Sequence, residues 1–126
     1  MMTTPVIFLP GSLCDERVFA DQLRQIDQPC EIADLTLDDS ITAMATRVLR
    51  EAPPQFVLVG LSLGGIVAAE IARLTSERVQ AMALVDTNLD AADDAQLRTR
   101  RRWATDVRAG HFAQVVEELV PVLTAS

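Results

Sequence analysis

Lysine and tyrosine are absent from this chain of 126 residues, and all eleven of its basic residues are arginines. Without lysine the chain has no P-loop lysine, no Schiff-base lysine and no Ser–Lys dyad, and without tyrosine it has no phenolic general acid. Histidine and tryptophan occur once each, and cysteine occurs twice. Cys14 and Cys30 match no CxxC or zinc-ligand spacing, so we expect free thiols and neither a metal nor a cofactor.

Positive charge and long apolar runs are also scarce. The formal net charge is −7, which argues against nucleic acid or an anionic membrane as a main partner. No apolar run approaches the ~20 residues that a membrane span needs, and the first residues, MMTTP, lack the basic and apolar parts of a signal peptide. Together with free thiols, these features predict a cytoplasmic protein. The apolar content of 49% predicts a globular core.

The most informative stretch is FVLVGLSLGGIVAAEIARL, residues 56–74. It begins with an uncharged, β-favouring run, which predicts a buried strand, and it ends with a segment of helix-forming residues. Between them lies G-x-S-x-G with Ser62 at its centre, the motif of a sharp strand-to-helix turn that exposes a serine hydroxyl. Gly60 and Gly64 leave room for that turn, and the start of the helix offers free N–H groups to an oxyanion. The alternative interpretation is a glycine-rich turn with an inert serine.

Strand and helix signals alternate along the first two thirds of the chain. The expected strands are Val6–Leu9, Cys30–Leu35, Phe56–Val59 and Val79–Asp86, with helices expected over residues 16–26, 41–49 and 66–74. This order predicts an α/β fold with a parallel sheet and helices on both faces. Ligands of such sheets bind beyond the carboxyl ends of the strands. Ser12, Ser62 and Asp86 are expected at that edge.

The remaining residues, 90–126, predict two helices that lie over the carboxyl edge of the sheet as a lid. We therefore divide a single domain into a sheet core, residues 1–89, and the start of a helical lid. The second lid helix contains Pro121, near which we expect it to kink or end. Trp103 in the first is expected to be a packing residue. A solvated face, rather than an anion site, is expected of Arg98, Arg100, Arg101 and Arg102.

Three segments together resemble the α/β-hydrolase superfamily, specifically its small esterases and acyltransferase-like members with a helical lid. They are VIFLPGS at residues 6–12, VLVGLSLGG at residues 57–65, and the apolar strand that ends at Asp86. The likeness covers nearly the whole chain. One departure is that proline and glycine precede Ser12 where many members have His-Gly.

The resemblance implies a catalytic centre with Ser62 as the nucleophile. It also implies that the N–H groups of Ser12 and Leu63 form the oxyanion hole, where each would stabilise the tetrahedral intermediate by about 3 kcal/mol. In the family the acid and the histidine follow the serine in the sequence, after the lid. The sequence therefore looks like the N-terminal portion of a hydrolase, from which the catalytic acid and histidine are missing.

Two residues are alternative partners for the serine. His111, the one histidine, stands at the start of the second lid helix, where we expect it to cap, pack or lie in solvent rather than to act as the base. Asp86 has a position from which a carboxylate could orient a histidine, but we expect it to cap the turn that follows its strand.

Two functions remain open. In the first, the chain is a serine hydrolase that cleaves a small-molecule carboxylic ester or thioester through an acyl-enzyme at Ser62. In the second, it is a non-catalytic, truncated module that binds an apolar ligand or associates with another chain, such as a homodimer formed through an exposed sheet edge or the lid helices.

Overall fold

The computed structural model describes residues 3–124, which divide into two compact units, with the boundary in the chain between Leu89 and Asp90. In the first unit, four parallel strands form one sheet in the order β2-β1-β3-β4. The strands are β1 (Val6–Leu9), β2 (Cys30–Ile32), β3 (Phe56–Leu61) and β4 (Val79–Val85). The helices are α1 (Ala20–Gln25), α2 (Ile41–Glu51) and α3 (Leu63–Leu74), with short 3-10 turns at Glu16–Phe19 and Ser76–Arg78.

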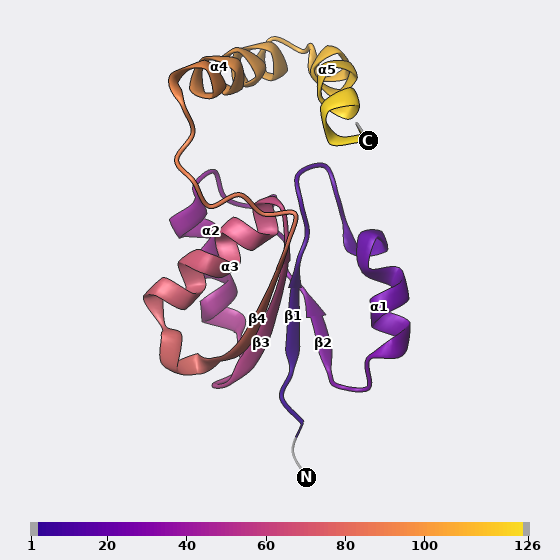
Figure 1. Cartoon of the computed structure of the whole chain (residues 1–126), viewed down its shortest axis with the longest axis vertical. Coiled ribbons are helices and arrows are strands. Elements are labelled where there is room, and N and C mark those ends of the chain that lie inside the picture. Colours follow the sequence, from indigo (N-terminus) through magenta and orange to yellow (C-terminus); the bar gives the residue numbers. More distant parts are fainter. Residues whose placement is uncertain (1–2, 125–126) are drawn as a thin grey trace. The chain divides into compact units, whose positions relative to one another are not determined.

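Helices cover both faces of this sheet, as predicted (Figure 1). Because side chains alternate along a strand, Ile7 and Leu9 of β1 point to the core beneath α2 and α3. Val6 and Phe8 point to the opposite core, where the Phe8 ring lies 4.8 Å from that of Phe19 at the start of α1. The α/β fold class expected from the alternating sequence pattern is confirmed.

Two strands differ from their expected form. β2 ends at Ile32 rather than at Leu35, because Asp34 accepts hydrogen bonds from the backbone N–H and the hydroxyl of Thr36 and so turns the chain. β4 is apolar, yet all its residues after Val79 are exposed. It pairs with β3 on one side only and forms one edge of the sheet.

The second unit is a helical hairpin made of α4 (Asp94–Arg108) and α5 (Phe112–Thr124). Asp93 and Gln96 form a capping box at the start of α4, and Pro121 lies inside α5, which continues past it to Thr124, the last described residue. Glu118 of α5 accepts hydrogen bonds from the guanidinium of Arg102 and the indole N–H of Trp103. These donors lower the pKa of Glu118 to about 2, Arg102 contributing most. Within residues 3–124, no helix has the length and apolar character needed to cross a membrane.

Candidate active site

Ser62 occupies a strained turn between β3 and α3, which is called the elbow below. Its backbone has φ 54° and ψ −113°, a region that non-glycine residues seldom adopt. Its N–H donates to the carbonyl of Val85 on β4 at 2.9 Å, and its own carbonyl accepts from Gly65 N at 2.9 Å and Ile66 N at 3.2 Å. The sheet on one side and the first turn of α3 on the other thus hold Ser62 in this conformation. Its side chain remains half-exposed.

Glycines make this turn possible because backbone atoms, or the side chain of Thr87, occupy the space that a side chain would need. A Cβ on Gly60 would lie 2.5 Å from the Cα of Gly65, and a Cβ on Gly64 would lie 1.9 Å from the carbonyl oxygen of Leu9. A Cβ on Gly65 would lie 1.9 Å from the hydroxyl oxygen of Thr87. The first turn of α3 therefore packs directly against the ends of β1 and β4. These distances confirm the steric role predicted for Gly60 and Gly64.

The loop after β1 passes beside Ser62. Its turn is closed by a hydrogen bond from Cys14 N to Gly11 O at 3.1 Å, and Leu13 has φ 63°, as the third residue of a type II turn requires. A Cβ added to Gly11 would lie 3.4 Å from the Cβ of Ser62. The Ser12 N–H donates to no acceptor within residues 3–124, and Leu63 begins α3, where N–H groups lack a helical partner. Both N–H groups predicted for an oxyanion hole thus lie in segments next to Ser62.

Backbone strain gathers at one edge of the sheet. Among the described residues, positive φ in a residue other than glycine occurs at Leu13, Ser62 and Asp86. Each follows the carboxyl end of a strand, β1, β3 and β4 respectively. Such conformations cost about 1–3 kcal/mol each and are typical of functional sites. The carboxyl edge of the sheet therefore combines backbone strain with the position at which parallel sheets bind ligands, so it is the candidate site of this unit.

A cleft of about 720 Å³ opens at this edge. One wall is the loop after β1, the other is the loop after β2, and Leu63 contributes from the start of α3. Its volume is within the range of small-molecule sites. The lining residues are Pro10, Gly11, Ser12, Leu13, Cys14, Asp15, Glu16, Ile32, Ala33, Asp34, Leu35, Thr36 and Leu63.

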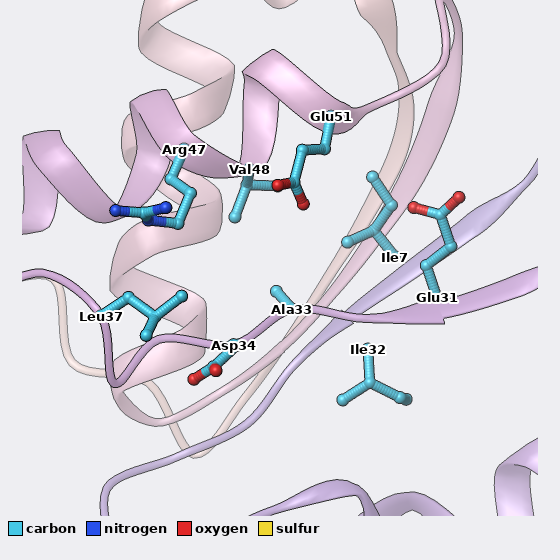
Figure 2. A pocket seen from close by; sticks show the side chains of 9 residues that line it. All are labelled: Ile7, Glu31, Ile32, Ala33, Asp34, Leu37, Arg47, Val48 and Glu51. Carbon is cyan, nitrogen blue, oxygen red and sulfur yellow. The ribbon is translucent and has the colours of Figure 1, made fainter.

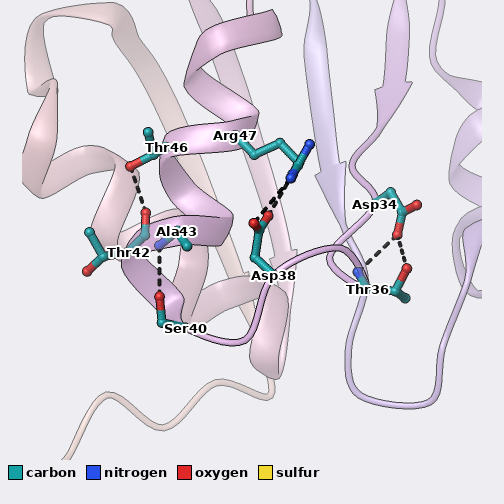
Figure 3. Close-up of polar contacts among 8 residues, drawn as sticks. All are labelled: Asp34, Thr36, Asp38, Ser40, Thr42, Ala43, Thr46 and Arg47. Carbon is teal, nitrogen blue, oxygen red and sulfur yellow. Dashed lines mark hydrogen bonds and ion pairs between the residues drawn. The ribbon is translucent and has the colours of Figure 1, made fainter.

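The second wall of the cleft is fixed by polar contacts, which Figure 3 shows. Asp34 binds Thr36 as described above, and Asp38 forms an ion pair with Arg47 of α2 at 2.6 Å. Ser40 lies outside the cleft lining and caps α2 by accepting from Ala43 N at 3.1 Å. The hydrogen bonds from Arg47 lower the pKa of Asp38 below its ordinary value. Because the strand was expected to continue to Leu35, no loop was predicted where this wall lies, although the aspartates and threonines of the segment are typical of a turn.

A smaller pocket of about 150 Å³ lies between β2 and α2, lined by Arg47 and Glu51 of the helix and by Glu31 and Asp34 of β2 and the segment after it (Figure 2). It shares residues 32–34 with the cleft. The segment after β2 therefore borders both cavities, and it is anchored by the buried Leu35 and by the hydrogen bond from Ala33 N to Phe8 O at 2.9 Å. Within residues 3–124, no three metal-ligating side chains come together.

The two alternative partners of the serine lie in different units. Asp86 follows β4, in the same unit as Ser62; it is exposed, and within residues 3–124 its side chain accepts no hydrogen bond, so the turn cap expected of it is not observed. His111 belongs to the second unit and precedes α5. Its backbone N–H donates to Asp106 O at 2.8 Å, its carbonyl accepts from Val115 N at 3.3 Å, and the residue is exposed.

Comparison with known proteins agrees with this geometry. A family model described as the alpha/beta hydrolase fold matches residues 27–124. Two curated relatives are pimeloyl-[acyl-carrier protein] methyl ester esterases. The one from Klebsiella pneumoniae (strain 342) is 51% identical over 57 residues, which are 44% of this chain and 22% of the relative. The one from Citrobacter koseri is 37% identical over 82 residues, 63% of this chain and 30% of the relative.

Solved structures match over a larger part of the chain. An esterase from Thermogutta terrifontis superposes with a TM-score of 0.77 at 23% identity, over 95% of this chain and 50% of its own length. A thioesterase domain from the curacin biosynthetic pathway gives a TM-score of 0.59 at 22% identity, over 82% of this chain and 46% of its own. The chain thus spans about half of these structures and under a third of the curated relatives. Its strand order, its elbow at Ser62 and the matching family model lead to one conclusion: the chain belongs to the α/β-hydrolase fold family.

Proposed function

We propose that this chain carries the nucleophile and the oxyanion hole of a serine hydrolase that cleaves a carboxylic ester or thioester. The observation that carries the proposal is the strained backbone of Ser62, φ 54° and ψ −113°, between β3 and α3. A serine held at such a turn extends its hydroxyl from the sheet edge, where a substrate carbonyl can approach. An inert serine would have no reason to keep a conformation that costs free energy.

The reaction follows from the groups around Ser62. The Ser62 Oγ attacks the carbonyl carbon, and the oxygen of that carbonyl takes the negative charge next to the N–H groups of Ser12 and Leu63. Collapse of the tetrahedral intermediate expels the alcohol or thiol, which takes up the proton that the serine lost. Water then attacks the acyl-enzyme and releases the acid, and the proton returns to Ser62.

This centre lacks an assigned general base, the group that accepts the proton of Ser62. Residues 1–89 contain no histidine, so the unit that holds Ser62 has no imidazole base. We infer that the base and the acid that orients it come from outside this sequence, since the matched solved structures are about twice as long. His111 and Asp86 are the alternatives within the chain.

For the substrate we propose an acyl methyl ester or an acyl thioester. The curated relatives are named as methyl ester esterases of a pimeloyl-[acyl-carrier protein], and a structural neighbour is named as a thioesterase domain. The cleft supports an acyl chain because its lining includes Leu13, Leu35 and Leu63. We further propose a cytoplasmic protein that needs no metal or cofactor; Cys14 and Cys30 are free thiols, which suits a reducing compartment.

The proposed oxyanion hole can be tested at Ser12. Replacing Ser12 by proline removes its N–H, while proline is well accepted at the second position of a type II turn. We expect Ser12→Pro to slow modification of Ser62 by a fluorophosphonate probe, followed by intact mass, by about 10²–10³-fold. Ser12→Ala is the matched control: it keeps the N–H and should react within about twofold of the wild type. Equal rates for the proline and alanine variants would show that Ser12 is not an oxyanion donor.

A second candidate function, self-association, is favoured by the exposure of β4. The strand reads VQAMALV and carries no charge in a chain of net charge −7, and Met82, Leu84 and Val85 are exposed. The Val85 carbonyl faces β3, where it accepts from Ser62 N, so the alternate residues Met82 and Leu84 direct their backbone groups to the open edge. Antiparallel pairing about Met82 would place Leu84 opposite Gln80 of the partner subunit. The edge lacks the charge and proline that usually prevent such pairing.

Substitution at Leu84 tests this candidate. If β4 pairs with β4 of a second copy, light scattering after gel filtration should give twice the chain mass. Leu84→Arg should return the mass to that of a monomer, because a charged side chain on an otherwise uncharged edge strand disfavours edge-to-edge pairing. Leu74→Arg, at the exposed end of α3, is the control that should leave the dimer intact. A wild-type monomer at the highest attainable concentration would refute pairing through β4.

A further inference from the structure

We propose that Thr87 is a positioning residue for Ser62, whose hydroxyl ties the elbow to the end of β4. This inference rests on the proposed function, since it concerns the orientation of the proposed nucleophile. Thr87 lies outside the G-x-S-x-G motif, and only the fold brings its hydroxyl close to Ser62.

The hydrogen bonds of Thr87 converge on the elbow. Its Oγ1 lies 3.0 Å from the carbonyl oxygen of Val85 and 3.4 Å from that of Ser62. The same Val85 carbonyl accepts from Ser62 N at 2.9 Å. The single O–H of Thr87 therefore lies between two carbonyls, with the shorter contact to Val85, whose carbonyl also receives the elbow's own N–H, and the longer contact to Ser62. A hydroxyl at this point restrains both the N–H side and the carbonyl side of Ser62.

Packing holds the Thr87 side chain in this place. A Cβ on Gly65 would lie 1.9 Å from Oγ1 of Thr87 and 2.7 Å from both its Cβ and its Cγ2. Thr87 therefore fills the notch that Gly65 leaves in the first turn of α3, and it is half-buried there. The residue before it, Asp86, has φ 46°, so the chain turns at the end of β4 just before Thr87. Gly65, Asp86 and Thr87 together form a contact between β4 and the elbow.

This contact matters because the conformation of Ser62 is intrinsically unfavourable. A residue with φ 54° and ψ −113° persists only where its surroundings over-determine it. Without the hydroxyl, both carbonyl oxygens lose this contact and the elbow gains freedom to relax. A nucleophile displaced even slightly from its attack geometry reacts more slowly. Thr87 thus acts on the reaction through Ser62 without touching substrate.

Two substitutions separate the hydroxyl of Thr87 from its shape. Thr87→Val keeps the shape and removes the hydroxyl, and Thr87→Ser keeps the hydroxyl and removes the methyl group. We expect Thr87→Val to slow fluorophosphonate labelling of the full chain about fivefold to tenfold and to speed hydrogen exchange of the Ser62 amide by a similar factor. Thr87→Ser should stay within about twofold of the wild type in both. If the valine variant fails to fold, Thr87→Ala takes its place against the serine variant.

A control threonine distinguishes positioning from general stability. Thr75, at the other end of α3, is buried and donates to Glu77 Oε1 at 2.8 Å, so Thr75→Val should lower the melting temperature without changing either readout at Ser62. Unchanged exchange of the Ser62 amide in Thr87→Val, or a serine variant as impaired as the valine variant, would overturn the inference. A wild-type chain that never labels would refute the proposed function instead, and amide exchange would still decide the role of Thr87.

Discussion

Replacing Ser62 with alanine is expected to abolish covalent labelling of the chain by a fluorophosphonate probe. The wild type should gain one adduct, because its oxyanion-hole donors accelerate attack at phosphorus even where the histidine and acid of a full centre are absent; such donors and binding alone retain about 10³–10⁴-fold of acceleration in serine proteases. Alanine leaves no nucleophile at the elbow. Intact mass and peptide mapping would show the loss of the adduct from the peptide that contains residue 62.

Two further variants serve as controls for this result. Ser40→Ala removes the cap of α2, which should cost about 1 kcal/mol of stability but leave labelling unchanged. His111→Ala should also leave the labelling rate within about twofold, because we propose that the base lies outside this sequence. An adduct that persists in Ser62→Ala would contradict the assignment of the nucleophile. Loss of labelling in His111→Ala would show that His111 is the base after all.

The largest expected effect on stability comes from Gly64→Ala. The added Cβ would fall 1.9 Å from the carbonyl oxygen of Leu9, 2.4 Å from its carbonyl carbon and 2.8 Å from the carbonyl oxygen of Pro10. These are backbone atoms at the end of β1, so they cannot move aside as a flexible side chain would. Overpacking in a well-packed core costs about 1–3 kcal/mol and more where backbone must shift. We expect at least about 3 kcal/mol, measured by urea unfolding of the first unit.

Gly110→Ala supplies the comparison for this glycine. Within residues 3–124, no heavy atom beyond the two neighbouring residues lies within 4 Å of a Cβ at Gly110, which has φ 90°, so its replacement adds backbone strain alone. We expect a cost of about 1–2 kcal/mol, confined to the helical hairpin of the second unit. A Gly64→Ala chain that unfolds at the same urea concentration as the wild type would contradict the close packing of α3 on β1.

The backbone architecture was largely predictable because its signals are local. The apolar runs that became β1 and β3, and the helical periodicity that became α2, each arise within one segment of the chain. An exposed sheet edge was expected, but its assignment to β4 was not predictable, because VQAMALV reads as a buried strand and only the sheet order places it at an edge. The early end of β2 depends on Asp34 and Thr36 competing with the strand for backbone hydrogen bonds.

The candidate site was predictable to a smaller extent. G-x-S-x-G locates Ser62 because the motif reports a strained turn, and the need for glycine at positions 60 and 64 follows from the same turn. Contacts between distant segments have no such signature. The loop after β2 as a wall of the cleft, and the hydroxyl of Thr87 beside the Ser62 carbonyl, depend on how strands are ordered in space. Neither can be inferred from spacing within one segment.

The most direct test of the account is a crystal structure of the phosphonylated chain. The adduct copies the tetrahedral intermediate, so its non-bridging oxygen reports the position of the oxyanion. If Ser12 and Leu63 form the oxyanion hole, this oxygen, on a phosphorus bound to Ser62 Oγ, lies about 2.7–3.1 Å from their backbone nitrogens. An oxygen that points to solvent, or phosphorus bound to another side chain, would contradict the account.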